Sequence, residues 1–265
     1  MKEISVYDLS GKEAGKVKLP EGFSDPVRED IIIKAVLAEM SQLRQPYGAD
    51  QLAGKRTSAH YHGMRHYRYT MMNREIARMK RIHTQGYLNL TARFVPQATK
   101  GRKAHPPKAE KVWKLKINKK ERVKALLSAI SATMNKDVVS ARGHKVDDIK
   151  HIPLIFADDF QKLKKSKDVL SVLEKFGFVK EIERCSERKI RAGRGKMRSR
   201  RYKQKKGPLI VVGKDEGIVK AARNIAGLDV ALPKQLTVSM LAPGTHPGRL
   251  VVWTKSAIEN FKVNK

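Results

Sequence analysis

The pattern of apolar and polar residues changes its period along the chain, and each period predicts a different element. Short apolar runs predict strands, whereas apolar residues three and four positions apart predict helices. Residues 3–7 are expected to form a strand, and residues 12–18 its hairpin partner. After residue 150 short strands and helices alternate, with apolar segments at 152–156, 169–176, 208–212, 218–226, 228–231 and 250–253. This alternation is typical of an α/β fold, in which helices flank a mostly parallel sheet.

Two longer helices are predicted before and after the central part of the chain. The first is expected to begin at about Pro26, with Asp25 as its N-cap. Its apolar face would be Ile32, Ala35, Val36, Met40 and Leu43. The second begins after Asn118, which forms a capping-box pattern with Glu121. Its apolar positions are Val123, Leu126, Leu127, Ile130 and Met134.

Positive charge is concentrated in two segments. The 265 residues include 57 Lys and Arg against 26 Asp and Glu, a formal net charge of +31. Residues 44–118 hold 17 basic and 3 acidic residues, residues 184–206 hold 12 and 1, and the remaining 167 residues carry only +6. We therefore predict a globular domain at 1–43 and 119–265, an extended basic loop at 44–118 inserted in it, and a basic segment at 184–206.

So large a charge requires a strongly anionic partner, either nucleic acid or an acidic membrane surface. No stretch approaches the ~18 to 20 apolar residues of a spanning helix, and residues 1–7 lack the features of a signal peptide. We expect a soluble, intracellular protein without a membrane partner. Cys185 is the only cysteine, so an internal disulfide and a cysteine zinc finger are both excluded.

The segment at 44–118 is too long for an ordinary connection, because structureless loops beyond ~12–15 residues are uncommon in compact domains. Its aromatic residues are Tyr47, Tyr61, Tyr67, Tyr69, Tyr87, Phe94 and Trp113. Basic side chains neutralise phosphates and aromatic rings stack on unpaired bases, so the mixture favours folded RNA over duplex DNA. A solvated charge run, the alternative, would not require so many aromatics.

Five histidines also lie in this segment, at His60, His62, His66, His83 and His105. Their spacing matches no known set of metal ligands. We therefore expect no metal site, and interpret these side chains as stacking or phosphate-contacting groups.

The segment around residue 200 is denser in charge, and residues 192–208 read AGRGKMRSRRYKQKKGP. Gly193 and Gly195 allow the backbone to approach phosphates, and the arginines offer bidentate contacts. Because like charges this close repel one another, we predict that the segment becomes ordered only when RNA surrounds it. A nuclear-localisation signal or a bare polybasic patch is the alternative.

Two features are shared with ligand-binding α/β enzymes. Asp158 and Asp159 follow the strand predicted at 152–156, where such enzymes hold magnesium. Residues 193–196 lack the spacing and the hydroxyl of a Walker loop, so we interpret the aspartates as a helix-start cap. Residues 213–217 are explained by a plain strand-to-helix turn. We expect no enzymatic activity and no catalytic residues.

Four stretches together resemble one protein family. Residues 192–212 (AGRGKMRSRRYKQKKGPLIVV) resemble the signature of large-subunit ribosomal protein four, in its archaeal and eukaryotic branch. Residues 52–58 (LAGKRTS) and 94–111 (FVPQATKGRKAHPPKAEK) resemble the start and the return of that family's internal loop. Residues 242–257 (APGTHPGRLVVWTKSA) resemble its C-terminal strand and helix. The matches lie in order and span nearly the whole chain.

The resemblance implies a Rossmann-like α/β domain that is a structural constituent of the cytoplasmic large ribosomal subunit, binds large-subunit ribosomal RNA and supports assembly. It also implies an internal loop that helps line the nascent-peptide exit tunnel near ribosomal protein twenty-two. We expect no homo-oligomer, and no cofactor other than structural Mg²⁺ ions of the RNA. The RNA contacts implied for the loop are Lys55, Arg56, His62, Arg65, Arg68, Arg93, Arg102 and Lys103. Those implied for the second segment are Arg191, Arg194, Lys196, Arg198, Arg200, Arg201 and Lys203.

One stretch departs from the family pattern. Relatives have a glycine-rich loop middle, whereas residues 64–85 are bulky here and include Met71, Met72 and Met79. Ile76, Met79, Lys80 and His83 are spaced as in a short helix. The sequence also has no counterpart of the long C-terminal extension of eukaryotic relatives. Two other classes stay open, namely an RNA-modifying enzyme on a Rossmann-like domain and a DNA-packing protein.

Overall fold

The computed structural model describes residues 3–261 and divides the chain into two compact units. The first, which we call the α/β domain, comprises Met1–Leu43 and Leu115–Lys265, and the second, the loop unit, comprises Arg44–Lys114. The chain re-enters the α/β domain at Leu115 rather than at residue 119. The reason is local, because the Leu115 N–H donates to Ser41 Oγ at 2.9 Å and Ile117 packs against the core.

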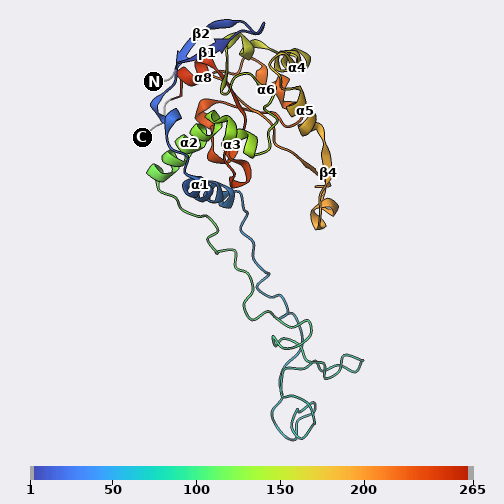
Figure 1. Ribbon diagram of the computed structural model, residues 1–265. Coiled ribbons are helices and arrows are strands. Elements are labelled where there is room, and N and C mark those ends of the chain that lie inside the picture. The colour runs from blue at the N-terminus through green and yellow to red at the C-terminus, as the bar shows by residue number, and fades with distance from the viewer. Residues whose placement is uncertain (1–2, 262–265) are drawn as a thin grey trace. The chain divides into compact units, whose positions relative to one another are not determined.

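A six-stranded sheet forms the centre of the α/β domain, with the order β2-β1-β3-β8-β6-β7 (Figure 1). Only β2 is antiparallel to its neighbour, and every other pair is parallel. The strands are β1 (Glu3–Tyr7), β2 (Glu13–Lys18), β3 (Leu154–Phe156), β6 (Leu209–Val211), β7 (Asp229–Ala231) and β8 (Val251–Thr254). The expected mostly parallel α/β sheet is confirmed.

Successive side chains of the central strands enter two different cores, one on each face of the sheet. In β3, Ile155 belongs to one cluster while Leu154 and Phe156 belong to the other. In β8, Trp253 and Val252 are divided in the same way. Both faces are therefore buried, which explains why these strands appear in the sequence as continuous apolar runs rather than as alternating ones.

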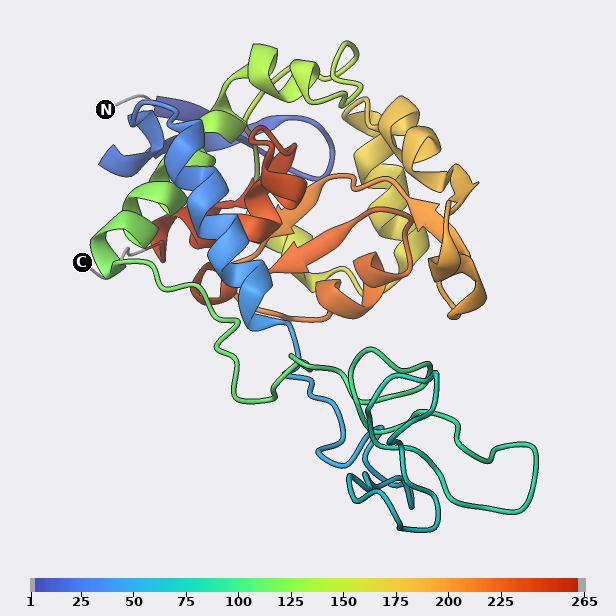
Figure 2. The ribbon, with the colours of Figure 1, turned by 90° about the horizontal axis from the view of Figure 1, so that it is seen from below.

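Helices cover both faces (Figures 1 and 2). One face packs against α1, α2, α7 and α8, and the other against α3, α4 and α6. The helices are α1 (Glu29–Gln42), α2 (Lys119–Met134), α3 (Lys136–Ala141), α4 (Ser166–Lys175), α5 (Val179–Ser186), α6 (Ile218–Arg223), α7 (Val238–Leu241) and α8 (Lys255–Glu259). Short 3₁₀ turns lie at Glu21–Ser24, Asp158–Lys162, Arg194–Met197, Pro233–Gln235 and Pro243–Thr245.

Several predicted details of α1 are wrong. The helix begins at Glu29 with Arg28 as N-cap, because Asp25 ends the preceding 3₁₀ turn and its carbonyl accepts from Ser131. Met40 and Leu43 are 51% and 84% exposed, so they do not belong to the buried face. Residues Ile32, Ala35, Val36, Ala38 and Ser41 are buried instead.

Helix α2 has the predicted N-cap, Asn118, but no side-chain hydrogen bond caps it. Glu121, the other half of the predicted capping box, instead accepts from Lys34 Nζ at 2.9 Å. Of the predicted apolar positions Ile130 is fully buried, and the small residues Ala125 and Ala129 are buried beside it. Small side chains allow α1 and α2 to pack closely.

The loop unit is an outgoing and a returning limb held together by a few contacts. Tyr47 stacks on Trp113, with 5.6 Å between ring centroids, and the Ala49 N–H donates to the Pro107 carbonyl at 2.9 Å. Gly54, with φ of +72°, lies so close to the backbone of Arg102 that a Cβ atom would be 2.6 Å from it. Only glycine fits at this crossing of the limbs.

The predicted short helix at residues 76–83 is wrong. Residues 44–114 contain neither helix nor strand, and Arg81 instead forms isolated β-bridges with His60 and Ala92. Ala59, Met71 and Ile82 are buried in a small core around these bridges. Five non-glycine residues of this unit have left-handed backbone, namely Tyr69, Asn73, Leu90, Phe94 and Lys100.

Candidate RNA interface

The basic segment after α5 folds as a β-hairpin. Strands β4 (Arg188–Ile190) and β5 (Tyr202–Gln204) pair antiparallel, with Lys189 opposite Lys203. We call residues 187–206 the basic hairpin, and Figure 1 shows it extending away from the sheet. Ile190 and Tyr202 are 63% and 52% exposed although they pair across the strands. Apolar side chains this exposed are suited to contact with a partner.

Six of the seven predicted contacts in the basic hairpin carry exposed side chains. They are Arg194, Lys196, Arg198, Arg200, Arg201 and Lys203. None of the six forms an ion pair with another part of residues 3–261. The hairpin therefore presents a cluster of cations whose charges are not neutralised within the described chain.

Arg191, the seventh predicted contact, forms hydrogen bonds within the hairpin. Its Nε donates to the Arg200 carbonyl at 3.0 Å and its Nη2 to the Tyr202 carbonyl at 3.4 Å, and the side chain is partly buried. Its donors are engaged with the opposite limb of the hairpin. Arg191 thus stabilises the hairpin turn, and only part of its guanidinium is free for an external phosphate.

A buried carboxylate, for which no local pattern gives a signal, anchors the base of the basic hairpin. Glu181 on α5 is fully buried and accepts from His144 Nδ1 at 2.6 Å and from the Lys145 N–H at 3.0 Å. It also accepts from Arg184 Nε at 2.8 Å. Arg184 Nη2 in turn donates to the Lys206 carbonyl at 2.9 Å. The network therefore connects α5, where the hairpin starts, to the residue where it ends.

The protonation states of this network follow from its contacts. Burial opposes the ionisation of Glu181, but hydrogen bonds from Arg184 and His144 outweigh it and lower the pKa of the carboxyl to about 2. Burial also lowers the pKa of His144, despite the nearby carboxylate. We assign a neutral His144 that donates from Nδ1 to Glu181 and accepts at Nε2 from the Leu250 N–H at 3.4 Å.

Two arginines of the α/β domain form hydrogen bonds within the domain instead of extending into solvent. Arg249 is 1% exposed and donates to the carbonyls of Gly207 and Met240 and to Asp229 at 2.6 Å. Arg142 donates to the carbonyls of Pro243 and His246. Their guanidinium groups give hydrogen-bond donors to backbone carbonyls in the connections between elements, where those carbonyls have no partner from a helix or a sheet.

Some of the predicted RNA contacts of the loop unit are exposed, whereas others form bonds within the unit. Lys55, Arg65, Arg68 and Lys103 are exposed, and Arg102 is half-buried. Arg56 pairs with Asp50, and Arg93 Nη1 donates to the Thr99 carbonyl at 2.6 Å. Arg81, which was not predicted, donates to the carbonyls of Ala77 and Leu90 and stabilises the bridges described above.

The aromatic residues of the loop unit are only partly available to bases. Arg44 and Lys111 both lie over the ring of Trp113, with their charged groups 3.9 and 4.3 Å from its centroid. Tyr69 stacks on His83. Tyr87 is 95% exposed and has no stacking partner within residues 3–261. The density of aromatics thus reflects internal packing as well as a surface for bases.

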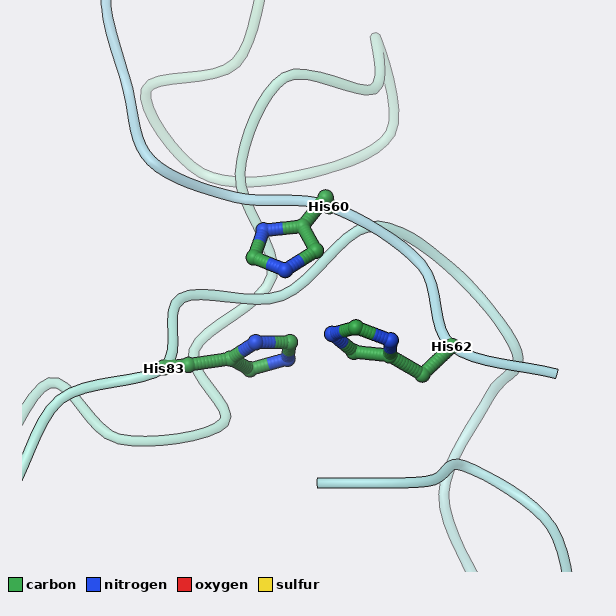
Figure 3. A group of neighbouring side chains, drawn as sticks. All are labelled: His60, His62 and His83. Atoms are coloured by element: carbon green, nitrogen blue, oxygen red, sulfur yellow. The ribbon is translucent and has the colours of Figure 1, made fainter. Parts of the chain in front are cut away.

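Three of the five histidines meet in the loop unit, although their spacing predicted no such cluster. The ring nitrogens of His60, His62 and His83 that face one another lie within 4.8 Å of one another (Figure 3). Burial, and then the neighbouring His60 and His62, lower the pKa of His83. The cluster forms because the bridge between His60 and Arg81 brings residue 83 beside residues 60 and 62.

The aspartate pair acts as the predicted type of cap, but for another helix. Asp158 accepts from the Ser256 N–H at 3.0 Å, at the start of α8, and from Gln161 at 2.8 Å. Asp159 is exposed and pairs with Lys162. The two carboxylates therefore serve separate contacts rather than one magnesium site.

The turn at residues 213–217 also has its backbone donors engaged. The Gly213 N–H donates to Thr254, the Lys214 N–H to Gln161, and the Gly217 N–H to Asp215. A phosphate cradle needs free backbone N–H groups. This turn therefore connects β6 to α6, as predicted.

The α/β domain carries an exposed cationic hairpin, and the long loop is rich in basic and aromatic residues. These features place the chain in the class of RNA-binding proteins. No helix within residues 3–261 is long and apolar enough to cross a membrane.

The chain belongs to the Ribosomal protein L4/L1 family, whose model matches residues 17–264. It is 47% identical over 258 residues to large ribosomal subunit protein uL4 of Archaeoglobus fulgidus, with 97% of each chain covered. It is 43% identical over 262 residues to the uL4 protein of Methanosphaera stadtmanae, with 98% of this chain and 96% of the relative covered. The uL4 protein of Nanoarchaeum equitans is 45% identical over 267 residues, with 99% and 98% covered. The family predicted from the sequence motifs is confirmed.

Proposed function

We propose that this protein is a structural constituent of the large ribosomal subunit that binds large-subunit ribosomal RNA and supports its assembly. Membership of the L4/L1 family and full-length similarity to large-subunit proteins support the assignment. The protein acts as a ribosomal component in the cytoplasm and not as an enzyme. It needs no cofactor of its own for RNA binding, and Mg²⁺ ions held by the RNA can contribute to the interface.

The observation that carries the proposal is the set of six exposed, unpaired cations on the basic hairpin, within the described residues. In water such a set is repulsive, whereas phosphates neutralise it and release counterions. The paired backbone of the hairpin fixes the positions of the Cα atoms from which these side chains extend. Residues Arg194, Lys196, Arg198, Arg200, Arg201 and Lys203 thus contact RNA phosphates, and Arg191 orients them while offering at most a partial contact.

The loop unit is the second RNA-binding element. Lys55, Arg65, Arg68, Arg102 and Lys103 contact phosphates, and Arg56 and Arg93 contribute from their internal pairs. His62 adds its ring to this surface. Left-handed backbone at five non-glycine residues costs free energy, so external contacts that RNA provides would stabilise this conformation.

The end of the loop unit lines the nascent-peptide exit tunnel near ribosomal protein twenty-two, and the protein functions as one copy per subunit. Residues 60–85 are the part that reaches the tunnel wall. This placement rests on family resemblance. It is supported by the small core around Met71 and Ile82, which gives the end of the loop a defined form.

The proposal is tested by reconstitution. Purified chain is mixed with the RNA and proteins of a large subunit that lacks its own uL4, and the particles are separated by sedimentation. We expect the chain to enter the large particle at one copy and to resist a salt wash. Failure to enter the particle, or equal recovery with an unrelated RNA, would refute it.

A further inference from the structure

We propose that His60, His62 and His83 bind one Zn²⁺ ion in the loop unit, with an exchangeable oxygen ligand completing the coordination. The zinc site shares His62 with the proposed RNA surface of the loop unit, but none of the basic side chains proposed to contact phosphates is a zinc ligand. It does not depend on the proposed ribosomal function, because the three ligands belong to one unit of the chain.

The geometry of the rings carries the inference. The centroid of His60 is 4.4 Å from that of His62 and 4.4 Å from that of His83, and those of His62 and His83 are 4.7 Å apart. One nitrogen of each ring points toward the space between the three (Figure 3). Small rotations of the side chains would bring these nitrogens to the ~2.0–2.1 Å at which imidazole binds zinc.

The hydrogen bonds of the rings leave a nitrogen lone pair free to bind zinc on His60 and on His83. His60 Nδ1 is 2.8 Å from the Ser58 carbonyl, which can only accept, so Nδ1 carries the proton and Nε2 carries the lone pair. A backbone carbonyl in this position is a usual hydrogen-bond partner of a zinc-bound histidine. His83 Nε2 is buried with no hydrogen-bond partner in the described chain. A buried polar atom without a partner is costly, and a metal ion would remove that cost.

The backbone and two tyrosines hold the ligands in place. His60 and Arg81 exchange hydrogen bonds of 3.2 and 3.1 Å, and the Met71 N–H donates to the His62 carbonyl at 3.2 Å. Tyr67 stacks on His62 and Tyr69 stacks on His83, with centroid separations of 4.5 and 4.7 Å. Ligands arriving from residues 60–62 and from residue 83 are thereby fixed relative to one another before metal binds.

The donor set favours Zn²⁺ over Mg²⁺, Ca²⁺ and phosphate. Three neutral imidazoles without a carboxylate suit Zn²⁺ and not Mg²⁺ or Ca²⁺, which require oxygen ligands. A phosphate would instead need protonated rings, and three cationic rings in van der Waals contact would repel one another. The surrounding basic residues oppose any cation, so a polyanion that neutralises them should strengthen zinc binding.

The test uses the full chain without an affinity tag, titrated with Zn²⁺ against a chromophoric chelator. We expect one ion per chain. His60→Gln and His83→Gln should each weaken binding at least ~100-fold, because even the loss of a group that only hydrogen-bonds to a ligand costs 10–100-fold at such sites. His66→Gln and His105→Gln, exposed histidines of the same unit outside the cluster, should leave the affinity unchanged.

A second measurement keeps the test independent of loop folding. X-ray absorption of the zinc-bound wild-type chain should give three imidazole nitrogens and one oxygen, and Co²⁺ should give the visible bands of a tetrahedral site. Absence of one bound equivalent, fewer than three imidazole ligands, or equal losses in the control variants would overturn the proposal. In that event the three rings would be only a stacked part of the loop core.

Discussion

Arg184 donates to the carbonyl oxygen of Lys206 at 2.9 Å, across 22 residues of chain, and this hydrogen bond closes the base of the basic hairpin. The same guanidinium donates to Glu181, which is fully buried beneath it. One side chain therefore connects the core of the α/β domain to both ends of the segment that carries the exposed cations. The base of the basic hairpin is thereby anchored to a buried carboxylate.

Replacing Arg184 with Met should destabilise the α/β domain strongly. The change leaves Glu181 buried without its cation, and removing one partner of a buried ion pair costs about 3 kcal/mol or more. Urea denaturation measures the loss. Arg194→Met, an exposed change in the same segment, should leave the free energy of unfolding nearly unchanged. Equal effects of the two substitutions would contradict the anchoring role of Arg184.

The same carboxylate predicts a loss of stability in acid. Because burial is outweighed by the bonds from Arg184 and His144, the pKa of Glu181 falls from 4.5 to about 2 on folding. The unfolded chain binds this proton more readily, so the stabilisation is complete above pH 4.5 and is lost as the pH falls toward 2.

The free energy of unfolding, measured across that pH range for the wild type and Glu181→Gln, tests this contribution. The difference between the two should shrink as the pH falls. A difference that stays constant with pH would mean that Glu181 does not titrate with a lowered pKa.

Arg198→Ala should weaken RNA binding in a salt-dependent manner. The side chain is exposed on the basic hairpin, and removing one phosphate-binding cation flattens the slope of log K against log salt by roughly 0.7 to 0.9. Filter binding to large-subunit ribosomal RNA over a salt series gives the slope. Arg223→Ala removes an exposed charge of α6 outside both basic segments and should not change it. An unaltered slope for Arg198→Ala would show that this arginine is merely solvated.

Deleting residues 60–85 should leave the α/β domain folded. Both of its cores are built from Met1–Leu43 and Leu115–Lys265, and none of their buried residues lies in the deleted segment. Thermal unfolding followed by circular dichroism should remain one cooperative transition near the wild-type temperature. Loss of that transition would show that the loop unit contributes to the stability of the domain.

Local sequence patterns predicted most of the sheet, because strands buried on both faces are continuous apolar runs such as residues 209–211 and 251–253. The start of α1 was missed because Asp25 ends a 3₁₀ turn instead, so the N-cap signal belonged to a different element. Met40 and Leu43 were wrongly predicted to be buried, because the helical spacing of apolar residues continues to them although the core ends before them.

Among the functional residues too, the sequence predicted local features but not those that depend on contacts between distant residues. Charge density located the basic hairpin and the loop unit, but it could not separate exposed Arg198 from Arg191, whose bonds form only when the hairpin pairs. The histidine cluster depends on a bridge between His60 and Arg81, and no local spacing encodes a contact between residues so far apart. Glu181 gave no signal, since its burial depends on His144 from a distant element.

The central claim is that exposed cations of the basic hairpin bind a specific folded ribosomal RNA. The most direct measurement is cosedimentation of the purified chain with large-subunit or small-subunit ribosomal RNA of Archaeoglobus fulgidus at matched salt. We predict that the chain sediments with the large-subunit RNA alone. A variant with Gln at residues 194, 196, 198, 200, 201 and 203 keeps the loop unit, so it should sediment with that RNA far less than the wild type does and lose it at lower salt. Equal sedimentation with both RNAs, or full binding by the variant, would contradict the account.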